Sequence, residues 1–342
     1  MPAAPAPSAR PTQAPPTAAL RLRGLDVTFR TRRGPVPAVR DVSLDVRRGE
    51  FLALLGESGS GKSVTARAIM GLTGSGADVS ADELRVAGTD VLTSTPEQLR
   101  RLRGATVSLV FQDALSALNP VLTIGAQIGE LYRQHQGASR KESRRRATEM
   151  LSLVGIPAAS SRVDDYPHQF SGGMRQRLLI AMAIALEPEL LIADEPTTAL
   201  DVTVQAQILE LLDRLRTELD MGVVLITHDL GVVCQVADSV AVMYAGRIVE
   251  RASADALFDR PGHPYTQALL GSVPQAGRIG HALPVIPGSP PHPGAQPSGC
   301  PFHPRCAWAV DACRDTRPPL EAVAPARESA CFRALEVLDA HA

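Results

Sequence analysis

The chain has 342 residues, a formal net charge of −1 and 44% hydrophobic residues, which is enough apolar sequence for a packed core of one large domain or two smaller ones. The near-zero charge gives no support to a nucleic-acid-binding protein, because such proteins normally carry a basic excess. No run of about 18 apolar residues occurs, so we expect no segment that crosses a bilayer.

The first 19 residues are a low-complexity Pro/Ala segment. Its prolines interrupt the apolar run that a secretory signal requires. We therefore expect residues 1–19 to be a disordered tail and the protein to be cytosolic, with any link to a membrane made through partners.

Strands and helices begin to alternate after this tail. We expect strands at Leu20–Phe29, Val42–Val46, Phe51–Leu55 and Thr106–Phe111, with a helix at about Gly61–Leu72. The wholly apolar run Phe51–Leu55 is typical of a strand buried on both faces.

Residues 112–186 are predicted to be mostly helical. Ser139 and Glu142 have the spacing of a capping box that opens a helix running to about Val154. The run Arg144–Arg146 lies on that helix, and a solvated face is favoured over a nucleic-acid patch because the chain is neutral overall.

The alternation resumes after Pro188 and indicates an α/β fold, in which a mainly parallel sheet is covered on both faces. The expected strands are Leu190–Ala193, Val223–Thr227, Ser239–Tyr244 and Arg247–Glu250, and the expected helices are Thr203–Leu219 and Leu230–Val236. Residues 20–270 form the predicted main domain. Residues 271–299 resemble a Pro-rich linker, and residues 300–342 are expected to form a small cysteine-bearing module.

A phosphate-binding loop is predicted between the strand at Phe51–Leu55 and the following helix. The sequence fits G-x-x-x-x-G-K-[ST], whose glycines let backbone N–H groups point at phosphate oxygens. Lys62 supplies positive charge to the β- and γ-phosphates, and Ser63 offers a hydroxyl to Mg²⁺. The residues expected to contact ATP here are Gly56, Glu57, Ser58, Gly59, Ser60, Gly61, Lys62, Ser63 and Val64.

Further polar residues follow three other predicted strands. Asp194 and Glu195 end one strand, where Asp194 is placed to hold Mg²⁺ and Glu195 to polarise a water. Gln112 and His228 follow two others. In a parallel sheet these ends share one edge with the phosphate loop, so we expect the four side chains to converge there as binding and catalytic residues.

The run Phe170–Arg177 resembles the signature motif of ABC ATPases. By that resemblance Gln112 is the Q-loop glutamine and a third Mg²⁺ ligand, Asp201 ends the D-loop Thr198–Asp201, and His228 is the switch histidine. The resemblance implies a P-loop NTPase core with an antiparallel β subdomain and a helical subdomain. It also implies a head-to-tail dimer, in which Ser171, Gly172, Gly173 and Asp201 reach the ATP bound by the partner subunit.

The segments Ser171–Arg177 and Asp194–Gln205 are similar to the first of two ATPases in bacterial oligopeptide and dipeptide importers. Three further features agree with this resemblance: His263–Tyr265, the Pro-rich stretch and Gly299–Cys306. This resemblance implies a peripheral subunit at the cytoplasmic face of the membrane. Its partners would be a related second ATPase, two transmembrane permeases and an extracytoplasmic substrate-binding protein. Nickel or another small solute is the alternative cargo. A soluble, non-transport ABC ATPase is a weaker alternative, because the chain has one ATPase unit and no coiled-coil insertion.

Members of this family usually stack an aromatic side chain on adenine ahead of the phosphate loop. Phe29 is the candidate here, with a place in the hydrophobic core as the alternative.

Four of the five cysteines, Cys300, Cys306, Cys313 and Cys331, lie near one end. The closely spaced pairs typical of structural zinc are absent. Iron–sulfur clusters accept more varied spacings, and some members of the resembled subgroup carry them, so a [4Fe–4S] cluster is favoured over zinc or free thiols. Cys234, on an apolar helix, is expected to be a core residue.

Overall fold

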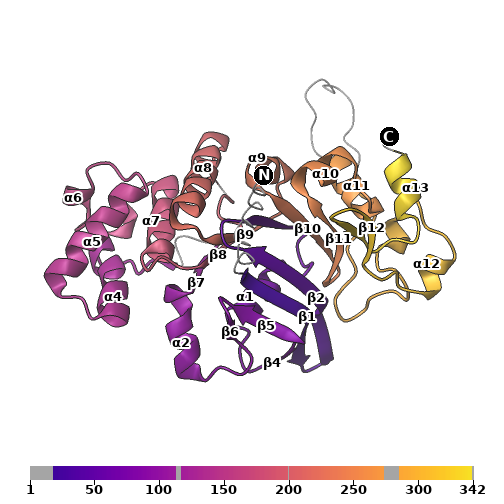
Figure 1. Ribbon diagram of the computed structural model, residues 1–342, viewed down its shortest axis with the longest axis horizontal. Helices are drawn as coiled ribbons and strands as arrows, with labels where there is room; N and C mark the ends of the chain where they lie inside the picture. The colour runs from indigo at the N-terminus through magenta and orange to yellow at the C-terminus, as the bar shows by residue number, and fades with distance from the viewer. Residues whose placement is uncertain (1–17, 113–116, 199, 273–284, 341–342) are drawn as a thin grey trace, which may run out of the picture.

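The computed structural model describes residues 18–112, 117–198, 200–272 and 285–340 (Figure 1). Most of the predicted N-terminal tail lies outside these ranges, as do residues 273–284 of the linker at 271–299 and Ala199 of the D-loop. No helix within the described ranges is long and apolar enough to cross a membrane.

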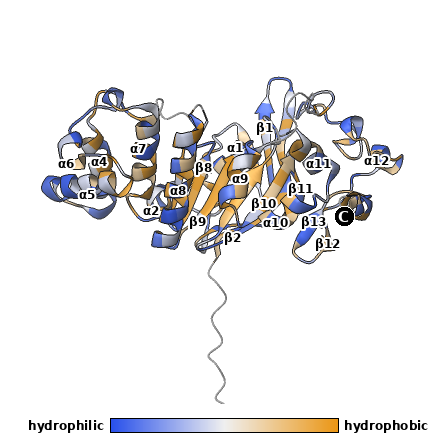
Figure 2. Ribbon diagram, turned by 90° about the horizontal axis from the view of Figure 1, so that it is seen from above, coloured by the Kyte–Doolittle hydropathy of each residue, from blue (hydrophilic) through white to orange (hydrophobic). Residues whose placement is uncertain are grey.

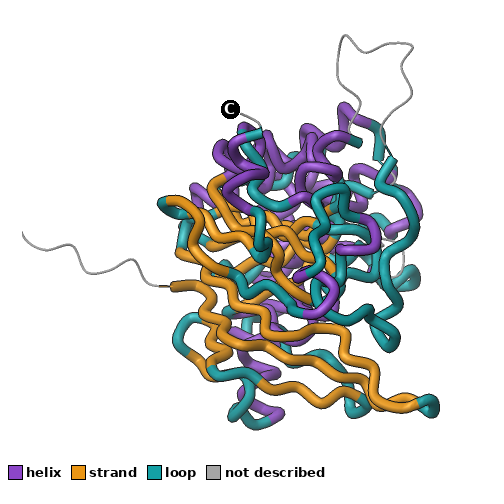
Figure 3. The backbone as a smooth tube through the Cα atoms, turned by 90° about the vertical axis from the view of Figure 1, so that its right-hand side faces the viewer, coloured by secondary structure: helices purple, strands orange, loops and turns teal. Residues whose placement is uncertain are grey.

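An antiparallel subdomain opens the chain. Its described strands form a five-stranded sheet in the order β2-β1-β5-β6, with β4 also paired to β1. Alternate side chains of β1, such as Leu20 and Leu22, are fully buried. Figure 3 shows these long strands on one side of the molecule. The strands are β1 (Ala18–Thr31), β2 (Gly34–Arg47), β4 (Ala77–Ser80), β5 (Glu83–Val86) and β6 (Thr89–Asp90).

The main sheet has the strand order β12-β13-β11-β10-β3-β9-β8-β7 among the described residues. The strands from β10 to β7 are parallel, but β11, β13 and β12 pair antiparallel, so the sheet is mixed rather than mainly parallel. Figure 2 shows its central strands as the hydrophobic part of the molecule. Their bounds are β3 (Phe51–Leu55), β7 (Val107–Val110), β8 (Leu190–Asp194), β9 (Gly222–Thr227), β10 (Ser239–Tyr244), β11 (Arg247–Ser253), β12 (Glu321–Ala324) and β13 (Arg327–Ser329).

Helices connect and cover these strands, and those predicted beside the main sheet are confirmed to within a few residues. Their bounds are α1 (Lys62–Ile69), α2 (Pro96–Ala105), α8 (Val202–Leu219), α9 (Leu230–Val236), α10 (Ala254–Asp259) and α11 (Pro264–Gly271).

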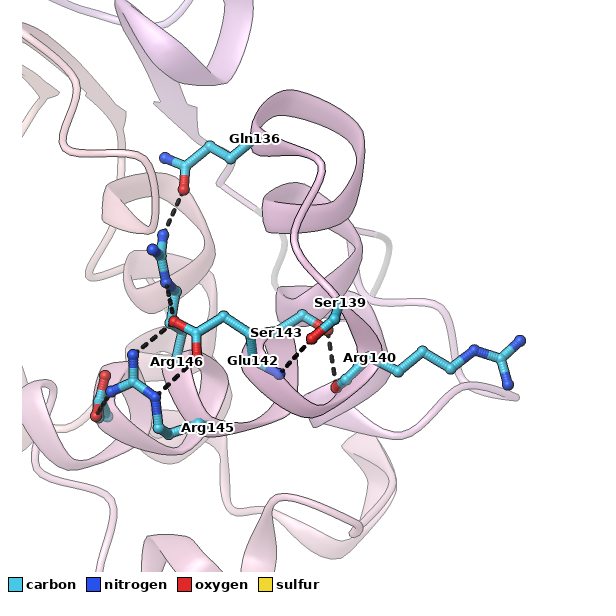
Figure 4. Close-up of polar contacts among 8 residues, drawn as sticks. Gln136, Ser139, Arg140, Glu142, Ser143, Arg145 and Arg146 are labelled. Carbon is cyan, nitrogen blue, oxygen red and sulfur yellow. Dashed lines mark hydrogen bonds and ion pairs between the residues drawn. The ribbon is translucent and has the colours of Figure 1, made fainter.

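The helical subdomain projects from one end of the main sheet (Figure 1). Its elements are α4 (Ile124–Gln136), α5 (Arg140–Leu153), α6 (Ala159–Arg162), the 3₁₀ helix η1 (Pro167–Gln169) and α7 (Gly172–Ile184). Ser139 caps α5 as predicted, since its hydroxyl accepts a hydrogen bond from the Glu142 N–H. The side chain of Glu142 instead binds Arg145 and Arg146, so the reciprocal half of the capping box is not formed (Figure 4).

Within the described residues, the structure does not show the small cysteine-bearing module that we expected at residues 300–342. Strand β13 pairs with β11 and so extends the main sheet, because β11 otherwise presents an open edge. Phe302 joins the apolar cluster of Val240, Val242 and Tyr265. The remaining elements of this region are η2 (His303–Arg305), α12 (Ala312–Asp315) and α13 (Ala334–Asp339).

Candidate active site

The phosphate loop connects β3 to α1, and its backbone requires glycine at two positions. Gly56 and Gly61 have φ angles of 151° and 107°. A Cβ atom at Gly56 would lie 2.2 Å from the carbonyl oxygen of Met243, and one at Gly61 would lie 2.8 Å from that of Ala38. A side chain at either position would therefore clash with the backbone. Glycine at both positions allows the loop conformation in which the N–H groups are unobstructed.

Lys62 is the first residue of α1, and its side chain turns back over the loop. The ammonium donates hydrogen bonds to the carbonyl oxygens of Gly56 (2.6 Å) and Glu57 (2.9 Å). Burial lowers the pKa of Lys62, and the nearby carboxylates of Glu195 and Asp194 raise it in part. The ammonium therefore lies beside the loop, at a buried position where water screens its charge only weakly.

Ser63 and Asp194 meet as the sequence predicts. The Ser63 hydroxyl donates to Oδ1 of Asp194 over 3.0 Å. Burial raises the pKa of Asp194, and the hydrogen bond from Ser63 lowers it in part. A half-buried carboxylate beside a hydroxyl is an oxygen donor set that suits Mg²⁺.

Glu195 is the centre of the predicted convergence. Its Oε2 accepts hydrogen bonds from Gln112 Nε2 (2.8 Å) and from the Thr198 hydroxyl (3.0 Å), and its Oε1 lies 3.2 Å from His228 Nδ1. The Glu195 backbone is left-handed, with φ of 49°, and its N–H donates to the Ile226 carbonyl. The ends of β7, β8 and β9 thus carry three polar side chains to one carboxylate.

A pocket of about 1130 Å³ lies over this edge of the sheet. The whole loop from Gly56 to Val64 lines it, together with Phe29, Gln112, Glu195 and His228. Phe29 thus faces the pocket rather than being confined to the core, although adenine stacking itself stays a prediction.

The signature residues lie elsewhere. Among the described residues that line the pocket, none comes from Ser171–Gly173 or is Asp201. Ser171 caps α7, and a Cβ at Gly173 would lie 2.5 Å from Val204, so α7 starts tightly against α8. Asp201 caps α8 by accepting a hydrogen bond from the Val204 N–H. Within one chain, the signature is not part of the nucleotide pocket.

Sequence reasoning missed several residues of this site. Thr198 was quoted only as part of a motif, but its hydroxyl binds Glu195. Leu269, Pro290 and Pro293 also line the pocket. They come from the C-terminal side of the chain, where no local pattern indicates a nucleotide site.

The described part of the structure shows neither the predicted iron–sulfur site nor the zinc alternative. Within the described residues, which include all five cysteines, no group of three or more His, Cys, Asp or Glu is arranged to hold a metal ion. Burial raises the pKa of Cys306 to about 11 and that of Cys331 to about 12. Cys234 is exposed on α9 and is not the expected core residue, because that short helix buries Leu230, Val232 and Val233 instead.

Two family models match the chain. Residues 39–198 match the ABC transporter model, and residues 249–313 match the model of the oligopeptide/dipeptide transporter C-terminal region. Of the described structure, the first match covers the phosphate loop, Gln112, Glu195 and Thr198 but not His228, and the second covers most of the segment from β11 to α12.

Named proteins that are similar to this chain agree with these two family matches. The dipeptide transport ATP-binding protein DppD of Bacillus subtilis is 50% identical over 86% of this chain and 88% of its own length. A putative peptide import ATP-binding protein of Brucella abortus is 50% identical over 87% and 90%, respectively.

Solved structures show the same fold. The dimeric ATP-binding cassette MJ0796, solved with ADP and Pi, superposes with a TM-score of 0.61 at 28% identity, over 69% of this chain and 98% of that one. The cbiO1 protein of Clostridium perfringens gives 0.61 at 25% identity, over 71% and 91%. Because it is 50% identical to named relatives over 86–87% of its own length and 88–90% of theirs, the chain belongs to the ATP-binding subunits of the oligopeptide/dipeptide family of ABC transporters.

Proposed function

We propose that this chain hydrolyses ATP at the pocket over β3 and α1, with Glu195 as general base, and thereby energises the import of oligopeptides or dipeptides. The observation that carries the proposal is the convergence of Gln112, Thr198 and His228 on the Glu195 carboxylate beside the phosphate loop. A carboxylate that is oriented by three neighbours is suited to take a proton from an attacking water.

The other side chains have complementary roles in this proposal. Lys62 leaves the loop carbonyls to bind the β- and γ-phosphates, which restore its hydrogen bonds. Ser63 and Asp194 would hold Mg²⁺, with Gln112 as the third expected ligand; when bound, the ion neutralises phosphate charge. Gln112 and His228 keep Glu195 aimed at the site of attack.

A second ATPase completes the site in this proposal. Neither the N-terminus of α7 nor Asp201 is among the described residues that line this chain's own pocket, which supports their use by a partner. Ser171 and the N–H groups of Gly172 and Gly173 would then meet the γ-phosphate of the partner's ATP in a head-to-tail dimer. The ATP-binding cassette MJ0796, described above, is itself dimeric.

Membership of this family supports a proposal for the remaining subunits and for the cellular location. We propose that the chain is peripheral at the cytoplasmic face of the membrane, with two permeases and an extracytoplasmic binding protein as further partners. Peptide cargo is supported by the Bacillus subtilis relative, which is named a dipeptide transport ATP-binding protein. Nickel or another small solute stays the alternative.

Uptake by cells tests both the ATPase role and the cargo. Cells whose own copy is replaced by the Glu195→Gln variant should lose uptake of a labelled dipeptide and keep uptake of a labelled free amino acid. Unchanged dipeptide uptake, in cells shown to lack a second peptide importer, would reject the cargo. Normal ATP turnover by the purified variant would reject the catalytic role.

We also propose that Cys300, Cys306, Cys313 and Cys331 bind a [4Fe–4S] cluster. Two contacts support their association. The Cys300 N–H donates a hydrogen bond to the Cys313 carbonyl. The Arg333 guanidinium lies 5.1 Å from the centre of the Trp308 ring, and this contact links the segment near Cys331 to the segment near Cys306. Cluster thiolates bind separate irons, so they need not converge on one point as zinc ligands do. Anaerobic purification should yield about four irons per chain; an iron-free protein overturns the proposal.

A further inference from the structure

The ATPase core does not build the nucleotide pocket alone. Leu269, on α11, and Pro290 and Pro293, from the following segment, line the same pocket as the phosphate loop and Phe29. All three are apolar, and all come from the region that matches the oligopeptide/dipeptide transporter C-terminal model. This region therefore adds an apolar wall to a pocket that the phosphate loop and the apolar residues Phe29, Val36 and Ala38 also line.

An ion pair fastens the same region to the phosphate loop. The Arg305 guanidinium donates to both carboxylate oxygens of Glu57, with Nη1–Oε2 of 2.7 Å and Nη2–Oε1 of 3.1 Å. The Arg305 side chain is 5% exposed and that of Glu57 is 26% exposed. The hydrogen bonds to Glu57 raise the pKa of Arg305. A bidentate pair of this kind fixes orientation as well as charge.

Two further contacts make Arg305 part of a rigid junction. The Glu57 N–H donates to the Tyr265 hydroxyl over 2.9 Å, and the Tyr265 ring packs in a buried cluster with Tyr244 and Phe302. Arg305 Nε donates to the Pro287 carbonyl over 2.8 Å. Arg305 thus joins the loop to the stretch of chain that carries Pro290 and Pro293.

The charge of Glu57 makes this junction relevant to ATP. A phosphate loop presents N–H groups and a lysine to an anion, and a free carboxylate within it would repel the triphosphate. Pairing with Arg305 cancels that charge and turns the Glu57 side chain toward the C-terminal region. Loss of Arg305 would leave a half-buried, uncompensated carboxylate in the loop.

We propose that the C-terminal region is part of the nucleotide site: Arg305 is a positioning residue that neutralises and orients Glu57, and Leu269, Pro290 and Pro293 form an apolar wall against which the base of ATP packs. The inference rests on the proposed function only in that ATP must bind at this pocket. It assigns nucleotide recognition to a region that the ABC transporter model does not cover.

Equilibrium binding to the purified full-length chain separates the two halves of the proposal, with ATP and inorganic tripolyphosphate as probes in the presence of Mg²⁺. Tripolyphosphate has neither base nor ribose. Arg305→Met should weaken both probes about tenfold. Leu269→Ala with Pro293→Ala should weaken ATP about threefold and leave tripolyphosphate unchanged.

A double variant and a matched control keep the test sharp. Glu57→Gln combined with Arg305→Met should restore most of the lost affinity, because no unpaired carboxylate remains. Arg260→Met is the control, since that guanidinium belongs to the same region but binds the Leu338 carbonyl; it should leave both affinities unchanged. Thermal melts establish that each variant is folded.

The outcomes are distinguishable. If Arg305→Met binds both probes normally, or if the double variant is as weak as Arg305→Met, the positioning role is wrong. If Arg260→Met weakens binding equally, general loosening of the C-terminal region explains the effect and overturns the proposal. If ATP and tripolyphosphate respond alike to the wall variants, the wall does not contact the base. Failure of the wild-type chain to bind ATP would instead overturn the proposed function.

Discussion

The helical subdomain and the junction beside the phosphate loop both contain arginine–glutamate contacts, but in opposite surroundings. On α5, Glu142 binds Arg145 and Arg146, and the three side chains are 36%, 56% and 37% exposed (Figure 4). At the junction, the Arg305 side chain is 5% exposed. The residue types are the same, and the difference lies in access to water.

This difference decides what each contact can do. On α5, Glu142 is shared by two arginines, and Arg145 also binds Glu149. Water and neighbouring charges can therefore replace any one partner, and salt screens the network. At the phosphate loop, a lost partner leaves a charge that water reaches poorly. We therefore expect the same kind of substitution to have large effects at the loop and small effects on α5.

The largest effect is expected for Glu195→Gln. The substitution keeps the shape and most hydrogen bonds of a side chain that Gln112, Thr198 and His228 hold, but it removes the base. ATP turnover by the assembled importer should fall by about 10²–10⁴-fold, the usual contribution of a general base. ATP binding should persist, and nucleotide-bound dimers with the second ATPase should accumulate.

Steady-state phosphate release and gel filtration measure these two outcomes. His228→Gln is an informative comparison, because it leaves the Glu195 carboxylate intact and should reduce turnover less. Turnover within about threefold of wild type in Glu195→Gln would show that Glu195 is not the general base.

The next effect is expected for Lys62→Ala. The buried ammonium contacts the carbonyl oxygens of the loop and is the cation closest to the expected phosphates. Its removal should weaken ATP binding by about 10–100-fold, as for a charge-assisted hydrogen bond in a site that excludes water. Titration calorimetry measures the affinity. Lys141→Ala, on exposed α5, is the matched control and should bind ATP normally. An equal loss of ATP affinity in both variants would contradict the difference that we expect between the phosphate loop and α5.

A smaller effect concerns pH and the buried His263, which caps α11 through Nδ1. Burial lowers the pKa of His263 to about 4 from its ordinary value of 6.5, so between these values the unfolded chain binds a proton that the folded chain does not. Its contribution to stability is therefore complete above about pH 6.5 and is lost as the pH falls toward 4, by up to about 3 kcal/mol.

Urea unfolding of wild type and His263→Asn at several pH values isolates this contribution. Asn keeps an acceptor for the Tyr265 N–H but does not titrate. The raised pKa of nearby Glu250 affects both proteins and cancels in the difference. The free energy of unfolding of wild type should fall more steeply than that of the variant between pH 6.5 and pH 4. Parallel curves would contradict a neutral, buried imidazole.

Much of the active site was predictable because its residues are either contiguous or tied to strand ends. The phosphate loop is one local motif, and the rule for parallel strands placed Gln112, Asp194 and His228 at the same edge before any contact was known. The helical subdomain was also predictable, from its helical pattern and from Ser139, which opens α5.

The remaining features depend on tertiary contacts that leave no local pattern. Arg305 and Glu57 are 248 residues apart, so nothing near either one indicates their pairing. Strand β4 is only four residues long, its apolar face consists of the half-buried Ala77 and Val79, and it went unpredicted. The pairing of β13 with β11 depends on the path of the tail. For Glu142, two nearby arginines competed successfully with the helix N-terminus for its carboxylate.

The smallest effect is expected for Glu142→Gln, the same change of residue type as at Glu195. Hydrogen bonds from Arg145 and Arg146 lower the pKa of Glu142 to about 2, but all three side chains are solvated. The midpoint of thermal unfolding should therefore shift by less than about 1 °C, and ATP turnover should not change. Raising the salt concentration from about 0.05 M to about 0.5 M should reduce even that shift of the midpoint, because salt screens exposed charges. A shift of several degrees that salt does not reduce would mean that the α5 network behaves as a buried one, and that exposure is not what separates the two regions.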